Sequence, residues 1–152
     1  MNRNKLQLEH LEMKIKMFAP VTKVVIPPTG WIKAVRLALG MTLQQLANRI
    51  SITKQSVLEM ELREKEGSIS LKSLREAARA LDMELVYGFV PKDGSLEFLI
   101  DRKAEEFATK IVSRTSQTMR LEDQENSKIR LEKAIKERKA LLKLEVPKVL
   151  WD

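Results

Sequence analysis

Hydrophobic positions recur at three- and four-residue spacing along most of the chain, and this periodicity predicts a mainly α-helical protein. A first amphipathic helix is predicted over residues 2–17, after which prolines interrupt the pattern. Short helical patterns fill residues 30–81, and longer, heavily charged ones extend from residue 95 to residue 144. We therefore expect a cluster of short helices flanked by helical segments of a different character.

The pattern divides the chain into three segments: residues 1–29, an N-terminal helix and proline-containing linker; residues 30–94, a helical domain that ends in a strand; and residues 95–152, a C-terminal helical region. The strand is predicted over residues 84–90, where β-favouring residues precede a Pro-Lys-Asp-Gly turn. A lone strand leaves its backbone groups unsatisfied. We expect it to pair with the same strand of a second copy, as a dimer ribbon; pairing with residues 23–26 of the same chain is the alternative.

Four helices are predicted in the central segment. The first covers Trp31–Leu39 and ends at Gly40. Thr42 begins the second and forms a capping box with Gln45. Threonine and serine also begin the last two, at positions 53 and 70. Two short helices joined by a tight turn, followed by a helix that starts with small polar residues, are typical of a helix-turn-helix motif.

Charge and composition restrict the classes of function and of site that this chain can have. The chain has 28 Lys and Arg against 21 Asp and Glu, and the net charge of +7 suits an anionic partner. It contains no cysteine and one histidine, His10, so metal sites and nucleophilic triads built from these residues are disfavoured. Neither a signal peptide nor a membrane span is recognisable. We expect a cytoplasmic protein that is not an enzyme and needs no cofactor or metal.

The start of the third helix carries the candidate chemistry, in the residues Thr53, Lys54, Gln55 and Ser56. Glutamine can make two hydrogen bonds to an adenine edge, lysine can reach guanine or phosphate, and hydroxyls can contact bases or backbone. In the alternative interpretation Thr53 only caps the helix and its neighbours are ordinary solvated side chains.

Residues 30–81 resemble the phage-repressor type of helix-turn-helix domain, the XRE or Cro/C1 type. The resemblance lies in these residues: Arg36-Leu-Ala-Leu-Gly40-Met-Thr42, Leu46-Ala47, Ile52-Thr53-Lys54-Gln55-Ser56-Val57 and Glu61. It implies that residues 53–56 enter the major groove of duplex DNA and that Thr42 and Gln44 meet a phosphate. It also implies a structural ion pair between Arg36 and Glu61. The DNA-facing set further includes Glu59, which could accept from cytosine or repel phosphate, and Arg63.

The longer pattern resembles the "mobile mystery protein A" family over about residues 27–152. The likeness rests on these segments: Pro28-Thr-Gly-Trp31, Gly67–Leu74, Leu85–Pro91, Leu121–Gln124 and Leu150-Trp-Asp152. It implies an antitoxin encoded beside a Fic-domain toxin, an enzyme that transfers AMP to hydroxyl groups. Fic inhibitors share a Ser or Thr followed four residues later by a Glu that blocks the ATP site. Thr118 and Glu122 match these two positions, and the alternative is that Glu122 is an ordinary surface residue.

Two compatible functions follow from the sequence. The central domain is expected to bind an inverted-repeat operator in double-stranded DNA as a homodimer and to repress its own operon. The C-terminal helices are expected to bind and inhibit a Fic-domain toxin. The alternative is a stand-alone regulator of a phage or mobile element without a toxin partner.

Overall fold

A computed structural model describes residues 3–117 and 124–152, and every regular element in these ranges is helical. The prediction of a mainly α-helical protein is confirmed. The chain separates into two compact units. One comprises residues 20–88, and the other combines the segment up to residue 19 with residues 89–152.

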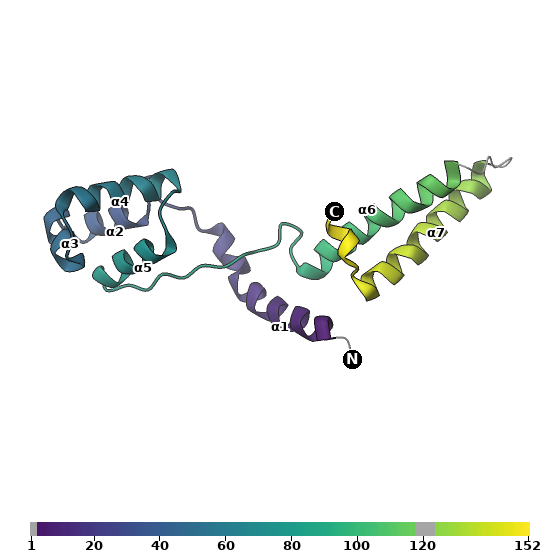
Figure 1. Cartoon of the computed structure of the whole chain (residues 1–152), viewed down its shortest axis with the longest axis horizontal. Coiled ribbons are helices and arrows are strands. Elements are labelled where there is room, and N and C mark those ends of the chain that lie inside the picture. Colours follow the sequence, from purple (N-terminus) through teal and green to yellow (C-terminus); the bar gives the residue numbers. More distant parts are fainter. Residues whose placement is uncertain (1–2, 118–123) are drawn as a thin grey trace. The chain divides into compact units, whose positions relative to one another are not determined.

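The unit of residues 20–88 contains four short helices (Figure 1): α2 (Trp31–Ala38), α3 (Leu43–Ile50), α4 (Lys54–Glu66) and α5 (Leu71–Ala80). Helix α3 packs against both α4 and α5, and α2 packs against α4 and α5 as well. The residues that share this core are almost fully shielded from solvent: Ile32, Leu46, Ala47, Val57, Ala77, Ala80 and Leu81. Two alanines at positions 47 and 77 are completely buried, which lets the helix backbones approach closely.

Side-chain caps begin three of these helices as the sequence predicts. Thr42 and Gln45 form a complete capping box at α3. The hydroxyl of Thr53 accepts from the amide of Ser56 at α4, and Ser70 caps α5 in the same way. Each cap satisfies an amide that the helix itself leaves without an acceptor. Local sequence therefore sets where these helices begin.

The strand predicted over residues 84–90 is not formed. This segment is extended, but it has no pairing in the described part of the chain, and neither does the alternative partner segment at residues 23–26. No backbone amide of residues 84–90 donates a hydrogen bond to any described residue. A strand exists only where a neighbouring chain segment completes its ladder, and one copy of this chain supplies none.

The second unit contains α1 (Arg3–Phe18), α6 (Leu96–Gln117), α7 (Gln124–Glu145) and a final 3₁₀ turn, η2 (Lys148–Trp151); another 3₁₀ turn, η1 (Ala19–Lys23), follows α1. Helices α6 and α7 lie side by side as an antiparallel pair (Figure 1). Their shared core consists of Ala104, Ala108, Leu142 and Leu150. Leu150 of η2 is only 4% exposed and packs in this core, whereas its neighbours Val149 and Trp151 are 38% and 51% exposed.

A charged cluster joins α6 to α7 beside this core. Asp101 on α6 accepts from Lys143 at 2.9 Å and lies 3.0 Å from Lys139, both on α7. These hydrogen bonds, from Lys143 first and Lys139 second, hold the pKa of Asp101 below its ordinary value. Helix α1 attaches at the start of α6, where the carboxylate of Glu12 accepts from the amide of Leu96 at 3.0 Å.

Candidate nucleic-acid interface

The first turn of α4 carries the four residues expected in the major groove. Thr53, Lys54 and Gln55 are exposed, whereas Ser56 is half-buried. The hydroxyl of Thr53 accepts from the Ser56 amide at 3.1 Å and lies 2.8 Å from the Ser56 hydroxyl. One hydrogen bond therefore joins the two hydroxyls, and Thr53 also acts as a cap in the free protein.

Lys54 and Gln55 differ from their two hydroxyl neighbours. Neither side chain has a hydrogen bond or an ion pair with any described residue, and both are exposed. Their ammonium and amide groups are therefore available to an external partner without first losing an internal contact. Of the four residues in this turn, these two have the geometry of contact residues.

Further along α4, Glu59 and Arg63 follow Gln55 at successive spacings of four residues, so all three lie on one helix face. All three are exposed. This face thus presents an amide, a carboxylate and a guanidinium in order. A negative charge in the middle of the row opposes a polyanion, while the amide and guanidinium at its ends suit one.

Helix α3 precedes the turn into α4, and its N-terminus, at Thr42, carries the two residues expected to meet a phosphate. Thr42 is committed to the capping box, in which its amide donates to Gln45 Oε1 at 2.8 Å and its hydroxyl accepts from the Gln45 amide. The side chain of Gln44 is exposed and donates to Asn48 Oδ1 at 2.8 Å. Asn48 is an exposed polar residue that sequence reasoning missed, although its four-residue spacing from Gln44 was visible.

A buried ion pair fixes α4 against α2. Arg36 Nε donates to Glu61 Oε1 at 2.5 Å, and Arg36 Nη2 donates to Glu61 Oε2 at 3.2 Å. The two side chains are 7% and 3% exposed. A third guanidinium nitrogen, Nη1, donates to the carbonyl of Met41 at 3.0 Å. The planar fork of arginine therefore ties α2, the loop before α3 and α4 together in one orientation.

A second carboxylate from α4 performs a role that the sequence pattern did not indicate. Glu64 accepts from the backbone amides of Trp31 at 2.9 Å and Ile32 at 2.8 Å. Helix α2 begins after Gly30, which has no side chain to cap it. Glu64 thus caps α2 from another helix, and its negative charge lies at the positive end of that helix.

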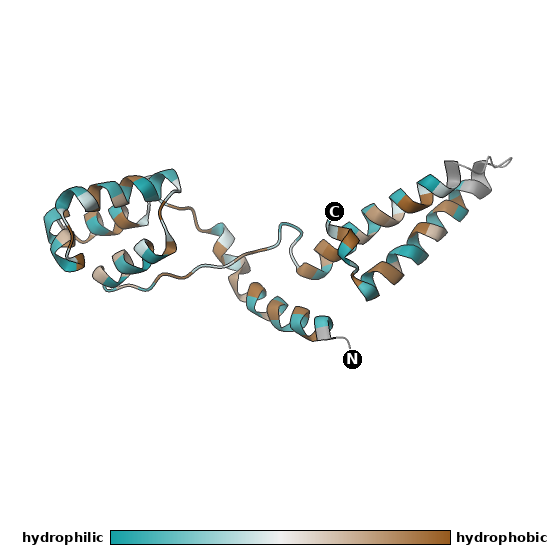
Figure 2. Ribbon diagram, in the orientation of Figure 1, coloured by the Kyte–Doolittle hydropathy of each residue, from teal (hydrophilic) through white to brown (hydrophobic). Residues whose placement is uncertain are grey.

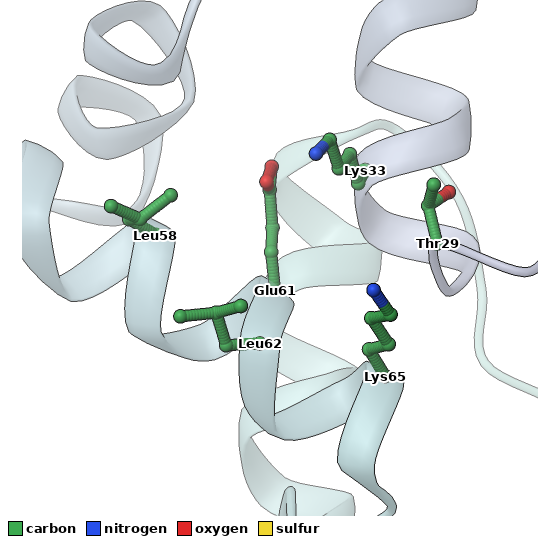
Figure 3. Close-up of a pocket in the computed structure, with 6 residues that line it drawn as sticks. All are labelled: Thr29, Lys33, Leu58, Glu61, Leu62 and Lys65. Atoms are coloured by element: carbon green, nitrogen blue, oxygen red, sulfur yellow. The ribbon is translucent and has the colours of Figure 1, made fainter.

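A small pocket opens between α2 and α4 beside this cap. Figure 3 shows Glu61 rising between the two helices, with Leu58 and Leu62 on one side and Lys33 and Lys65 on the other. Its volume is about 70 Å³. Cofactor and drug-sized ligand sites are typically about 300–1,000 Å³, so this pocket does not suit such a ligand.

The comparison with protein families agrees with this geometry. A family model described as helix-turn-helix matches residues 32–87. Residues 32–87 are a helix-turn-helix domain of the XRE type. No curated protein and no solved structure matches the chain. The match covers the Arg36–Glu61 pair and the exposed start of α4, and it extends into the extended segment after α5.

The remaining sequence predictions fall elsewhere. Thr118 and Glu122, the candidate toxin-inhibitory residues, lie outside the described residues. No helix in the described ranges is long and apolar enough to cross a membrane. Within the same ranges, no group of three or more His, Cys, Asp and Glu residues is placed to hold a metal ion.

Proposed function

We propose that the helix-turn-helix domain binds operator DNA and represses its own operon, acting by binding and not by catalysis. The observation that supports this proposal most directly is the exposed first turn of α4, where the side chains of Lys54 and Gln55 have no hydrogen bond or ion pair with the described residues. Arg36 and Glu61 hold that helix rigidly against α2. A rigid helix whose N-terminal polar residues point to solvent is the arrangement that reads base edges in the major groove.

In this proposal the contacts divide into two classes. Gln55 and Lys54 read base edges, with Thr53 and Ser56 contacting the bases or the adjoining backbone. Thr42, Gln44 and Arg63 position the domain on phosphates and carry no sequence information. Glu59 is assigned to neither class, because its carboxylate either accepts a hydrogen bond from a cytosine amine or repels the DNA backbone.

The test is retardation of a short DNA duplex taken from the promoter of the chain's own operon. The double variant Lys54→Ala with Gln55→Ala should lose specific binding, and each lost contact should cost about 1–3 kcal/mol. A control with Lys110→Ala and Gln7→Ala, both exposed and outside the domain, should bind as the unchanged protein does. Unchanged operator affinity in the double variant would reject the assignment.

We further propose that two copies bind as a homodimer through residues 84–90. The extended segment is rich in β-favouring residues, its amides have no partner among the described residues, and its Val86 and Phe89 side chains are 69% and 89% exposed. An antiparallel ribbon between two copies would satisfy the amides and give Val86 and Phe89, which point to opposite faces of the strand, cross-strand neighbours to pack against. Two domains held this way would read half-sites about 34 Å apart.

Proline substitution tests the ribbon without adding charge. Val86→Pro removes an amide donor and should abolish pairing, which sedimentation equilibrium would detect as a shift towards monomer. Val25→Pro is the matched control, because Val25 is 86% exposed outside the helices and its amide, like that of Val86, has no acceptor among the described residues. A dimer of unchanged strength in Val86→Pro would contradict the ribbon.

The C-terminal unit is proposed to bind and inhibit a Fic-domain toxin. Large apolar side chains remain exposed there, including Phe98 at 64%, Ile129 at 65% and Leu144 at 75%. Such residues on a charged helical surface favour a protein partner. Co-expression with a Fic-domain protein encoded beside this chain should yield a complex, and Phe98→Glu should weaken it.

The proposed inhibitory residues are tested by AMP transfer and not by formation of the complex. Glu122→Ala should restore AMP transfer by the bound toxin, with Glu125→Ala as the neighbouring control. Full inhibition by Glu122→Ala would assign the block to the docking surface instead. If no complex forms at all, the chain acts as a stand-alone regulator of a phage or mobile element.

A further inference from the structure

Helix α1 has two apolar faces, and hydrophobic positions recur along its whole length (Figure 2). One face contains Leu8, Ile15 and Phe18, which are all half-buried. The opposite face contains Leu6, Met13 and Met17, which are 43%, 69% and 80% exposed. An amphipathic surface helix needs only one apolar face, so the second face is unexplained by the packing of a single copy.

The exposed face has the spacing of a coiled-coil seam. Leu6, His10, Met13 and Met17 follow one another at intervals of four, three and four residues. This is the alternation of a and d positions in a heptad, with Leu6 and Met13 at d and His10 and Met17 at a. In coiled coils, helices that carry this repeat bury it against a matching repeat on another helix.

The charged residues beside the seam indicate that the partner helix is α1 of a second copy. Glu9 and Lys16 occupy the g positions, directly before the two a positions. In an antiparallel pair of identical helices, g positions face each other, so Glu9 of one copy meets Lys16 of the second copy twice over. Neither residue has an ion pair with any described residue of its own chain. The seam is therefore complementary in charge to a second copy of itself.

We propose that α1 pairs antiparallel with α1 of a second copy along the stripe of Leu6, His10, Met13 and Met17. In this register His10 packs against Met13 of the second copy, and Leu6 packs against Met17. A parallel register would instead place the two imidazoles side by side and align the two helix dipoles unfavourably. The seam spans about two heptads, so the contact is weak and depends on protein concentration.

Cysteine cross-linking of the full chain tests the register, because the chain contains no cysteine of its own. Under oxidising conditions an equal mixture of His10→Cys and Met13→Cys should yield at least five times more mixed disulfide dimer than either variant yields alone. Adding Met17→Glu to both variants should lower this yield about tenfold. Adding Leu11→Glu should leave it unchanged, since Leu11 is 50% exposed on the same helix but lies off the seam.

Two outcomes of the cross-linking would overturn the proposal. Dimers of one variant that exceed the mixed dimer would indicate parallel helices. Yields that fall equally with Met17→Glu and Leu11→Glu would indicate random collisions. The measurement needs no DNA and does not involve residues 84–90, so its failure leaves the proposed operator binding untouched.

Charge exchange and seam polarity give a second readout by sedimentation velocity, measured in the Val86→Pro background so that the proposed ribbon does not contribute. Glu9→Lys should weaken self-association several-fold, and adding Lys16→Glu should restore it; restoration by Lys14→Glu instead would contradict the antiparallel register. His10→Leu should tighten self-association about tenfold, because an apolar residue then fills the polar seam position. No change with His10→Leu would exclude the seam as the contact surface.

Discussion

The carboxylate of Glu64, on α4, lies close to Gly30 and caps the start of α2. A β-carbon at Gly30 would lie 2.8 Å from Oε1 of Glu64, closer than such atoms approach in proteins. Gly30 also has φ of 88° and ψ of 162°, a conformation adopted essentially only by glycine. The absence of a side chain at residue 30 is what allows a carboxylate from α4 to reach the amides of α2.

Gly30→Ala is therefore expected to lower the free energy of unfolding of the helix-turn-helix domain by about 2–3 kcal/mol, from backbone strain plus the displaced carboxylate. Urea denaturation followed by circular dichroism measures the loss. Gly40→Ala is the matched control: its φ is 68°, but no atom lies within 4 Å of the added carbon. Gly40→Ala should cost less, and equal losses at both glycines would contradict this account.

Glu64→Gln keeps the shape of the cap but removes its charge and one acceptor. The domain should lose about 1 kcal/mol, as other helix N-caps do when they are replaced. Glu66→Gln, an exposed residue two positions along the same helix, should change stability by less than about 0.5 kcal/mol. The same urea titration compares the two, and a loss confined to Glu66→Gln would exclude the capping role.

Removing one partner of the buried Arg36–Glu61 pair leaves an uncompensated charge in the core. Glu61→Leu alone should destabilise the domain by about 3–5 kcal/mol. The double variant Arg36→Met with Glu61→Leu should recover most of that loss, because two apolar side chains then fill the space without a buried charge. A double-mutant cycle from thermal unfolding checks this expectation; losses that simply add would show that the two residues are not coupled.

Removal of the negative charge at Glu59 should raise the affinity of the domain for DNA at low salt. Glu59→Gln is expected to tighten binding to unrelated duplexes several-fold, with a smaller effect at high salt where charges are screened. Fluorescence anisotropy at several salt concentrations measures this. Weaker binding that is confined to the operator would instead show that the Glu59 carboxylate accepts from a base.

The Asp101 cluster predicts a pH dependence in the C-terminal unit. Because the pKa of Asp101 is lowered in the folded state, its contribution is present at neutral pH and is lost as the pH falls through that pKa. Asp101→Asn should cost less than about 1 kcal/mol at pH 7, since the carboxylate is partly exposed. The difference from the unchanged protein should shrink as the pH falls below about 4, the ordinary pKa of an aspartate.

Trp151 fluorescence isolates this unit once Trp31 is replaced by phenylalanine, because the chain has two tryptophans. Glu97→Gln serves as the control, since Glu97 is exposed on the same helix and has no ion pair with any described residue. A stability difference for Asp101→Asn that persists unchanged at pH 3 would place its cause outside the carboxylate.

The sequence by itself determined the mainly helical fold and the starting residues of α3, α4 and α5. Capping by Thr42, Thr53 and Ser70 is predictable because each cap joins atoms three residues apart, and helical periodicity joins residues three and four apart. The family resemblance located the helix-turn-helix domain that the comparison finds at residues 32–87. Whether residues 53–56 contact DNA stays a prediction.

Only the tertiary structure decided which distant groups meet. Glu64 follows Trp31 by 33 residues, and its capping role required α4 to lie across the start of α2. The strand expected over residues 84–90 has β-favouring composition but no partner in one chain, and pairing is a property of two segments. Local hydrogen bonds depend on neighbouring residues alone, whereas these contacts depend on how the whole chain packs.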